Sequence, residues 1–349
     1  MPYLLSVIFV LGLSACSSSF EPLAGCEDNA ALSVHCGFQN PEDLALTPDG
    51  QFLIVSEFGG MSPLAPMQAG QLSLFDITSL SKHSLPISFA ENTWGEPSCS
   101  RTADTPIGPH GIDVVQRSDG RWQLAVVSHV PYESIEMFEL VNNGQWALEW
   151  KGCVKAEGLY YFNDVALTPQ GKVFATHMFD KGTSILSVVW YVFSKATSGS
   201  VVAWSQAQGF EALEFTAGSF PNGIAFDAAG RRLVVNYNTG DETLLYDLAS
   251  QQVIGRYAHN SPDNVVIKDG VVWVANHDHA ATETFRCEGQ VNCPLPFSIN
   301  QLSLDDLSLL KSYPFDGSNM GVGTVGVPHE GTLWIGSYHA DRLGRASLK

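Results

Sequence analysis

The chain repeats one pattern of apolar and polar positions six times. In each copy a short apolar run is followed by a turn that contains glycine, and a second apolar run leads back. Apolar runs on either side of such a turn are typical of a β-hairpin. The clearest copy is FNDVALTPQGKVFATH, residues 162–177. The other five are EDLALTPDGQFLIVSE, HGIDVVQRSDGRWQLAVVSH, NGIAFDAAGRRLVVNYN, DNVVIKDGVVWVANH and GTVGVPHEGTLWIGSYH.

The spacing of these copies predicts the fold class. They begin at residues 42, 110, 163, 222, 263 and 323, roughly 40 to 70 residues apart. Each interval is long enough for one four-stranded blade, so we expect an all-β fold, a closed six-bladed β-propeller with a central tunnel. A parallel β-helix would need shorter and more regular repeats. Further apolar runs, such as residues 71–76 and 243–247, are expected to form outer strands.

Composition narrows the class of protein. The 349 residues are 45 % hydrophobic and only 15 % charged, which indicates a globular chain with a large core. The formal net charge of −18 argues against a nucleic-acid partner, because phosphate backbones are bound by basic surfaces. Two interpretations of this acidity remain: a solvated surface, or carboxylates of which some serve a bound cation.

The first residues predict export. Residues 3–13 form an apolar run too short to span a bilayer, and Leu13-Ser14-Ala15-Cys16 resembles the bacterial lipoprotein cleavage box. The resemblance implies cleavage before Cys16 and a lipid on its thiol, although no Lys or Arg precedes the apolar run. A plain secretory signal and a buried N-terminal strand are the alternatives. We expect a signal peptide over residues 1–15, a lipidated cysteine and polar tether over 16–25, and one propeller domain over 26–349.

This interpretation places the protein in a bacterial envelope, facing the periplasm or the cell surface. Export implies an oxidising compartment, where disulfides form. The six remaining cysteines allow 15 pairings. The cysteines closest in sequence predict Cys26–Cys36 and Cys287–Cys293, which leaves Cys99 and Cys153. Free thiols are the alternative, and no Cys/His spacing suggests zinc.

Hairpin geometry predicts a single site. The second strand of each hairpin returns to the level of the residues that open the first strand. Oxygen-bearing residues at the openings are Glu42, Asp43, Asn163, Asp164, Asn222, Asp263 and Asn264. Carboxylate and amide oxygens suit a hard divalent cation, above all Ca²⁺. The alternative is that these residues serve only as turn formers.

Histidines recur at the same level. His129, His177, His277 and His339 close second strands, and His110 opens a first strand. Imidazole exchanges protons near neutral pH, so a cation that polarises a carbonyl and a histidine that activates water would together form a hydrolytic site. No G-x-S-x-G motif is present, so a serine nucleophile is not indicated.

The ordered motifs resemble the paraoxonase/arylesterase family of calcium-dependent lactonases, and more distantly the gluconolactonase and strictosidine-synthase-like propellers. The resemblance covers residues 38–347 and rests on GPHGID, VVSHVPYESIEMFEL, FNDVALTPQGKVFATHMF, FPNGIAFDAAGRRLVV, DNVVIKDGVVWVANH and GTVGVPHEGTLWIGSYH. It implies a six-bladed propeller with a central metal-binding tunnel that holds two calcium ions.

The resemblance also implies roles for individual residues. The catalytic calcium would be held by Glu42, Asn163, Asn222, Asp263 and Asn264. The structural calcium would take Asp43, Asp164 and the Ile112 carbonyl, together with Asn163. The family's histidine dyad would be His110 and His129, with Asp263 as a rival base or nucleophile. His177, His277 and His339 would line the substrate pocket.

The chain departs from the animal members of that family in two respects. Their chain ends are joined by a disulfide, but no cysteine follows Cys293, so we expect closure by strand pairing between the ends or by other bridges. The apparent lipid anchor stands in place of their amphipathic N-terminal helix. The almost continuously apolar segment 184–196 is interpreted as a lid, a partner surface or a membrane contact.

The functional hypothesis is a monomeric, lipid-anchored, calcium-dependent hydrolase of lactones or aryl esters. One alternative is a non-catalytic envelope propeller, stabilised by calcium, that binds a partner. The other is a hydrolase of sugar lactones.

Overall fold

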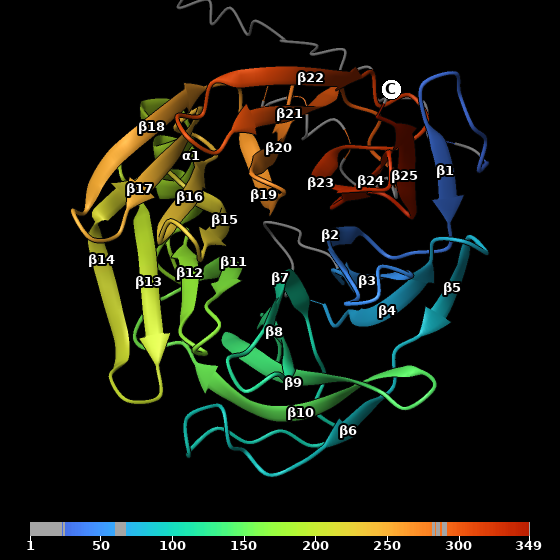
Figure 1. Cartoon of the computed structure of the whole chain (residues 1–349). Helices are drawn as coiled ribbons and strands as arrows, with labels where there is room; N and C mark the ends of the chain where they lie inside the picture. Colours follow the sequence, from blue (N-terminus) through green and yellow to red (C-terminus); the bar gives the residue numbers. More distant parts are fainter. Residues whose placement is uncertain are drawn as a thin grey trace, which may run out of the picture.

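Six sheets form a ring around a central axis in the computed structural model (Figure 1). The structure describes residues 23, 25–59, 68–280, 283, 287 and 292–348. The predicted six-bladed β-propeller is confirmed. The predictions of a signal peptide and of a lipid on Cys16 concern residues outside these ranges, and they stay predictions.

The innermost two strands of each blade are the six predicted hairpins. In blades 1 to 3 they are β2 (Pro41–Leu46) and β3 (Phe52–Glu57), β7 (Pro109–Gln116) and β8 (Trp122–Ser128), and β11 (Phe162–Leu167) and β12 (Val173–His177). In blades 4 to 6 they are β15 (Pro221–Asp227) and β16 (Arg232–Tyr237), β19 (Pro262–Lys268) and β20 (Val271–His277), and β23 (Gly323–His329) and β24 (Thr332–Ser337).

The outer strands complete the blades. Blades 1 and 2 add β4 (Gln71–Asp76) and β5 (Ser81–Ser84), and β9 (Ser134–Asn142) and β10 (Trp146–Lys155). Blades 3 and 4 add β13 (Gly199–Ser205) and β14 (Gly209–Gly218), and β17 (Glu242–Asp247) and β18 (Gln252–Ala258). Blade 5 adds β21 (Phe297–Ser303) and β22 (Leu309–Phe315), and blade 6 adds β25 (Arg342–Ser347) and β1 (Ser33–Cys36).

Blade 2 differs from the expected four strands. A fifth strand, β6 (Ile87–Phe89), pairs in parallel with β10 at the outer edge of the sheet. The connection from blade 1 to blade 2 runs along this edge, where the backbone of β10 still has free hydrogen-bonding groups to satisfy.

The two ends of the chain meet in blade 6. Strand β1 pairs antiparallel with β25, in a register that sets Ser33 opposite Arg345 and Cys36 opposite Arg342. The last blade is therefore built from both ends of the described chain, and the predicted closure by strand pairing is confirmed. A closed ring leaves no open gap between its first and last blades.

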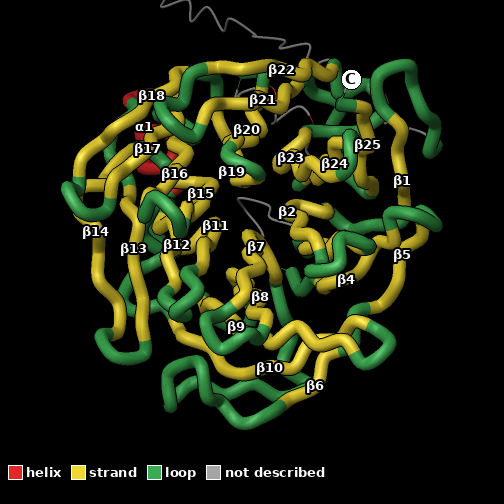
Figure 2. The backbone as a smooth tube through the Cα atoms, viewed as in Figure 1, coloured by secondary structure: helices red, strands yellow, loops and turns green. Residues whose placement is uncertain are grey.

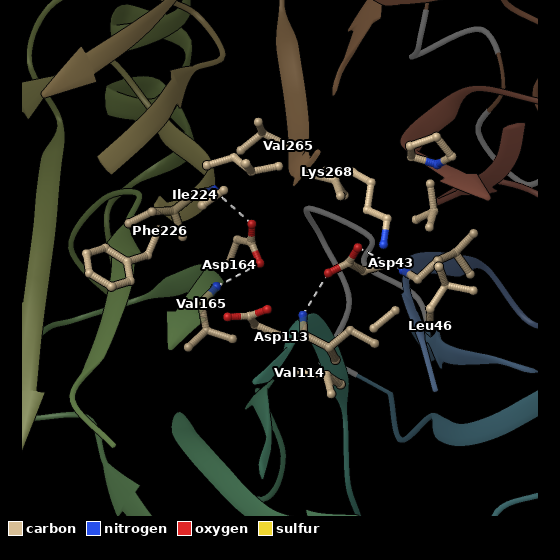
Figure 3. A pocket seen from close by; sticks show the side chains of 18 residues that line it. Asp43, Leu46, Asp113, Val114, Asp164, Val165, Ile224, Phe226, Val265 and Lys268 are labelled. Atoms are coloured by element: carbon tan, nitrogen blue, oxygen red, sulfur yellow. Dashed lines mark hydrogen bonds between the residues drawn. The ribbon is translucent and has the colours of Figure 1, made fainter. Parts of the chain in front are cut away.

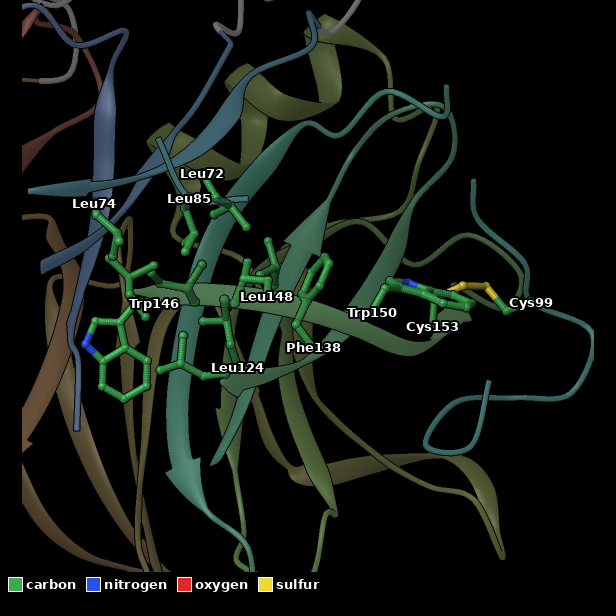
Figure 4. Packing of buried hydrophobic residues seen from close by; sticks show 14 residues of the cluster. Leu72, Leu74, Leu85, Cys99, Leu124, Phe138, Trp146, Leu148, Trp150 and Cys153 are labelled. Carbon is green, nitrogen blue, oxygen red and sulfur yellow. A yellow bond between two sulfur atoms is a disulfide. The ribbon is translucent and has the colours of Figure 1, made fainter. Parts of the chain in front are cut away.

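Each blade buries side chains on both faces, because it packs against two neighbours. In β8, Leu124 and Val126 face the core shared with blade 1, and Ala125 and Val127 face the core shared with blade 3. This is the alternation of a β-strand, with both faces apolar. Figure 4 shows the cluster between blades 1 and 2. A fully buried leucine stabilises such a core by about 1.5–3 kcal/mol.

Three disulfides connect Cys26 with Cys36, Cys99 with Cys153, and Cys287 with Cys293. The two short-range pairings are confirmed, and the remaining two cysteines also pair. The bridge from Cys99 to Cys153 lies beside the buried Trp150 (Figure 4). Three disulfides are typical of an exported protein.

A helix lies between the inner hairpin of blade 3 and its outer strands (Figure 2). The apolar segment between β12 and β13 forms α1 (Ile185–Ser194). Ser184 is its N-cap, and the Ser184 side chain accepts a hydrogen bond from the Ser187 backbone. None of its residues is buried, and Leu186 and Phe193 are 83 % and 73 % exposed. Within the described residues, no helix combines the length and apolar character that crossing a membrane requires.

Candidate functional site

Every inner strand carries a register irregularity at the residues that open the hairpin. In β11 it falls between Phe162 and Val165, and the other five inner strands show it at the same place. An irregularity of this kind bends a strand and redirects its side chains, and it is common beside active sites. Because of it, the neighbouring residues Glu42 and Asp43 belong to two different clusters of side chains, which lie at two levels of the tunnel.

The first cluster joins four blades at one level of the axis. Its central contact is a 2.9 Å hydrogen bond from Asn264 Nδ2 to Glu42 Oε1. Among the described residues, five buried carboxylate or amide oxygens have no hydrogen-bond partner in the protein. Four of them are Glu42 Oε2, Asn163 Oδ1, Asn222 Oδ1 and Asn264 Oδ1. Buried polar atoms are nearly always paired, so these four oxygens need a partner from outside the chain.

The donor set suits a hard cation. Amide and carboxylate oxygens from the inner strands of blades 1, 3, 4 and 5 are the ligands that Ca²⁺ prefers. Over the described part of the chain, no group of three or more His, Cys, Asp or Glu side chains is placed to hold a metal ion. The residues present therefore fit calcium better than zinc.

Asp263, the fifth predicted ligand, lies beside a histidine. Its Oδ2 is 3.0 Å from His277 Nε2. His277 is the last residue of β20, which runs next to the strand that carries Asp263. One carboxylate oxygen of Asp263 thus faces an imidazole, which leaves the other for the cluster.

Donors from neighbouring blades fix the backbone of the cluster. Ser56 Oγ donates to the His110 carbonyl at 2.6 Å, and Thr176 Oγ1 donates to the Asn222 carbonyl at 2.6 Å. Asn236 Nδ2 donates in the same way to the carbonyl of Asp263. Each donor is the next-to-last residue of a second strand, and each acceptor opens the next blade. Sequence reasoning missed these donors, although their common repeat position is visible in the sequence.

His110 and His129 form the predicted pair. His110 Nδ1 is 2.8 Å from His129 Nε2, and both residues are buried. His110 Nε2 lies 3.6 Å from Glu42 Oε1, so this nitrogen faces the cluster. Phe58 stacks on His110 with a centroid distance of 4.7 Å, and Tyr161 stacks on His129 at 4.9 Å. The two aromatic rings hold the imidazoles between them.

A third residue, Glu133, completes this group, and sequence reasoning missed it. Both of its carboxylate oxygens are 3.0 Å from His129 Nδ1. Its Oε1 also accepts a 2.9 Å hydrogen bond from the backbone of Phe162, at the start of β11. Glu133 lies inside the VPYESIEMFEL motif, but nothing in the sequence pattern distinguishes it from the other acidic residues there.

The other predicted histidines are placed differently. His177 accepts from the Tyr161 backbone at Nδ1, and its Nε2 lies 3.2 Å from Asp180, so both ring nitrogens have partners in the protein. His339 lies two residues beyond β24, and its ring contacts that of Tyr338 at 5.9 Å. The ring of Tyr338 in turn lies 6.0 Å from that of His277, which connects His339 to the site through one intervening ring.

The second cluster lines a cavity of about 240 Å³ further along the axis (Figure 3). Asp43 Oδ2 accepts from the Ile112 N–H at 2.7 Å, and Asp164 Oδ2 accepts from the Ile224 N–H at 2.8 Å. Each aspartate therefore bridges its own inner strand to that of the next blade. The structure thus places Asp43, Asp164 and Ile112 around one cavity, and a calcium ion held there with the Ile112 carbonyl stays a prediction.

A third aspartate, absent from the prediction, shares this cavity. Asp113 Oδ2 accepts from the Leu167 N–H at 2.7 Å and so continues the same bridging pattern from blade 2 to blade 3. Lys268 lines the same cavity (Figure 3). Close packing requires glycine nearby: a Cβ on Gly111 would lie 2.3 Å from Asp164 Oδ1.

Burial shifts the acidities in the tunnel. It raises the pKa of Asp43 to about 7 and that of Asp113 to about 6. Burial, with nearby carboxylates, also raises the pKa values of Glu42 and Asp164 well above their ordinary range. Buried carboxyl groups that lie close together are disfavoured in their ionised form unless a positive charge binds near them.

Burial and the neighbouring His129 lower the pKa of His110 well below its ordinary value. His110 is therefore neutral at neutral pH and has a free lone pair on one ring nitrogen. A neutral imidazole next to a cation-binding cluster is able to accept a proton from water.

The fold and the site define a six-bladed β-propeller with an axial, oxygen-lined site and a buried histidine pair. The family model described as Arylesterase matches residues 29–343, so the chain belongs to the arylesterase family. The resemblance drawn from the motifs is thereby confirmed. No curated protein matches the sequence.

Solved structures share the fold at low sequence identity. A luciferin-regenerating enzyme is 12 % identical with a TM-score of 0.53, over 90 % of this chain and 95 % of that one. A gluconolactonase from Xanthomonas campestris is 14 % identical with a TM-score of 0.53, over 91 % and 89 %. A streptogramin B lyase is 11 % identical with a TM-score of 0.50, over 91 % and 97 %. Likeness at this identity shows the fold alone.

Proposed function

We propose that the protein is a calcium-dependent hydrolase of lactones or aryl esters. One observation carries the proposal: four buried oxygens from four blades have no partner in the protein and lie at the level of a neutral histidine. Membership of the arylesterase family supports the same class of reaction. A bound Ca²⁺ would supply the positive charge that polarises the substrate carbonyl and stabilises the oxyanion formed on it.

The residues of the chain would bind the ions and transfer the proton. Glu42, Asn163, Asn222, Asp263 and Asn264 would hold the ion at the mouth, and Asp43 and Asp164 with the Ile112 carbonyl would hold a second one deeper in the tunnel. His110 Nε2, facing the cluster, accepts the proton of the attacking water, and His129 shares the resulting charge. Asp263 is the rival base, and one of its carboxylate oxygens lies 3.0 Å from His277 Nε2 in a contact that is not a hydrogen bond.

Metal analysis of the purified soluble domain, together with a panel of lactones and aryl esters, tests the proposal. We expect about two calcium ions per chain and turnover that a chelator abolishes and added calcium restores. Asn222→Ala removes one unpaired oxygen and is expected to lower kcat/KM at least about 100-fold, because the ion that polarises the substrate carbonyl loses a ligand. Unchanged turnover in this variant would falsify the mechanism.

Asn238→Ala is the matched control. Asn238 belongs to the same blade, but its Nδ2 already donates to the Pro262 carbonyl at 3.2 Å and its oxygen is not among the unpaired ones. We expect it to retain kcat/KM within a few fold. If both variants lose activity equally, the effect is general destabilisation of blade 4.

Two other functions have some support. The exposed apolar helix α1 favours a propeller that binds a partner and uses calcium only for stability. Calcium that is tightly bound without any hydrolysis in the panel would favour that function. The likeness to a gluconolactonase favours sugar lactones, and a preference for polar aldonolactones over acyl lactones in the same panel would identify it.

A further inference from the structure

Glu133 ends a chain of three hydrogen-bonded side chains that reaches the site. From the protein interior outward, the contacts are Glu133 to His129 Nδ1 at 3.0 Å, His129 Nε2 to His110 Nδ1 at 2.8 Å, and His110 Nε2 to Glu42 Oε1 at 3.6 Å. All of these residues are buried. Because Glu133 and His129 are shielded from water, their hydrogen-bond partners within the protein determine which nitrogen carries each proton.

The contacts assign these protons. A carboxylate only accepts hydrogen bonds, so the nitrogen of His129 that faces Glu133 must be the protonated Nδ1. The Nε2 of a neutral His129 is then an acceptor, so His110 must donate from its own Nδ1. The remaining nitrogen, His110 Nε2, has a lone pair, and it is the one that faces the metal cluster.

We infer that Glu133 is a positioning residue that sets the tautomers of both histidines, so that the free lone pair of His110 faces the site. The inference rests on the proposed function for its catalytic consequence, but the tautomers follow from the two hydrogen bonds, with one proton on each imidazole. Without Glu133, either nitrogen of His129 could carry the proton, and half of the arrangements would leave His110 with its N–H, not its lone pair, towards the cluster.

The carboxylate itself is held in place. Its Oε1 accepts from the backbone of Phe162, the residue that precedes Asn163 in the chain. The Glu133 carbonyl accepts from Ala156 at 2.9 Å, which fixes the backbone as well. Glu133 therefore connects the histidine pair with the strand that carries two predicted metal ligands, and its side chain has no other described role.

Two substitutions of Glu133 distinguish the effect of its hydrogen-bond acceptor from the effect of its negative charge. In Glu133→Gln the amide oxygen remains an acceptor for Phe162 N–H and His129 Nδ1–H, whereas the negative charge is lost. In Glu133→Leu both are lost. We expect unchanged tautomers in the first variant with kcat about tenfold lower, and mixed tautomers in the second with kcat at least about 100-fold lower. KM should change little in both, because Glu133 is not expected to touch substrate.

Glu136→Gln is the control for folding. Glu136 is a fully buried glutamate three residues along, paired with Arg101 at 3.0 Å and with Trp150, and it does not contact either histidine. We expect a lower melting temperature with both tautomers and kcat retained. This control shows whether removing a buried carboxylate in this region is by itself enough to lower turnover.

The direct measurement is ¹⁵N NMR of the imidazole nitrogens in histidine-labelled protein, with calcium and with chelator. Protonated Nδ1 and unprotonated Nε2 in both His110 and His129 support the inference, and an unprotonated Nδ1 in His129 overturns it. So does a Glu133→Leu variant with unchanged tautomers or unchanged kcat. Correct tautomers in a protein that hydrolyses no ester or lactone would instead overturn the proposed function.

Discussion

Asn264 and Glu42 are 222 residues apart in the chain, yet the amide of the first donates to the carboxylate of the second at 2.9 Å. The bond connects blade 5 with blade 1, the two neighbours of blade 6 in the ring (Figure 1). Each partner retains one oxygen without a hydrogen bond. The pair therefore joins two blades and presents two candidate ligands to an ion.

Asn264→Ala is expected to weaken calcium binding at least about tenfold and to lower the free energy of unfolding of the chelated protein by about 1–3 kcal/mol, because Glu42 loses its donor. Calorimetric titration and urea unfolding measure the two effects. Asn300→Ala is the control, since Asn300 is equally buried, donates one bond and has one unpaired oxygen, but lies on β21. Equal losses of calcium affinity in both variants would contradict the assignment of Asn264.

Calcium removal should make stability depend on pH in a defined direction. Burial raises the pKa of Asp43 from 3.8 to about 7 and that of Asp113 from 3.8 to about 6. Between pH of about 4 and 7 the folded chain holds protons that the unfolded chain releases, so the free energy of unfolding falls as pH rises. For these two groups together we expect a loss on the order of 6 kcal/mol in chelator, and a much smaller loss with calcium, which favours the ionised carboxylates.

Asp113→Asn tests how much of this pH dependence of the free energy of unfolding is due to Asp113. The asparagine oxygen still accepts from Leu167 N–H, but the side chain no longer titrates. Urea unfolding in chelator at pH 5 and pH 8 should therefore give a smaller difference between the two pH values than in the parent protein. A difference that is unchanged, or that has the opposite sign, would show that Asp113 is ionised in the folded chain without calcium.

Thr176 should influence calcium binding without being a ligand. Its hydroxyl donates to the Asn222 carbonyl and accepts from Asp164 N–H, so Thr176→Val leaves two buried backbone groups unpaired. We expect weaker calcium binding as well as about 1–3 kcal/mol lower stability.

Thr216→Val serves as the comparison. The Thr216 hydroxyl is equally buried and also donates once and accepts once, to Leu213 and from Val201, away from the axis. It should reduce stability by a similar amount and leave the calcium affinity unchanged. Calcium titrations that give the same affinity for both variants would remove Thr176 from the site.

The fold was predictable because every blade contains the same local sequence pattern, two apolar runs joined by a turn. Each inner hairpin is specified by its own apolar runs and turn, as in residues 162–177, so six separate local signals agree on one architecture. The oxygen-bearing residues were predictable for the same reason, since their position in the repeat determines the end of the strand at which they lie. The agreement of these positions across the repeats, and not any single motif, indicated a candidate site.

What could not be predicted depends on contacts between blades or on unrepeated segments. Glu133 has no counterpart in the other blades, and its role arises only when the backbone of Phe162 packs against it. Asp113 lies at a repeat position that is otherwise occupied by small or apolar residues, so the repeat pattern does not predict a role for its carboxylate. The helix α1 formed where β-branched and aromatic residues favour a strand, and the Ser184 side chain caps it by accepting from the Ser187 N–H.

The bridge between Cys99 and Cys153 should stabilise the protein more than the bridge between Cys26 and Cys36. The first spans 54 residues and the second spans 10, so the entropy removed from the unfolded chain corresponds to about 4 and about 3 kcal/mol. The longer bridge also attaches to blade 2 the segment that leads into His110. Replacing both cysteines of each pair by serine and measuring urea unfolding in saturating calcium gives the two losses. If the Cys26–Cys36 variant loses more, then the short bridge acts through the closure of blade 6, where β1 pairs with β25, and not through chain entropy.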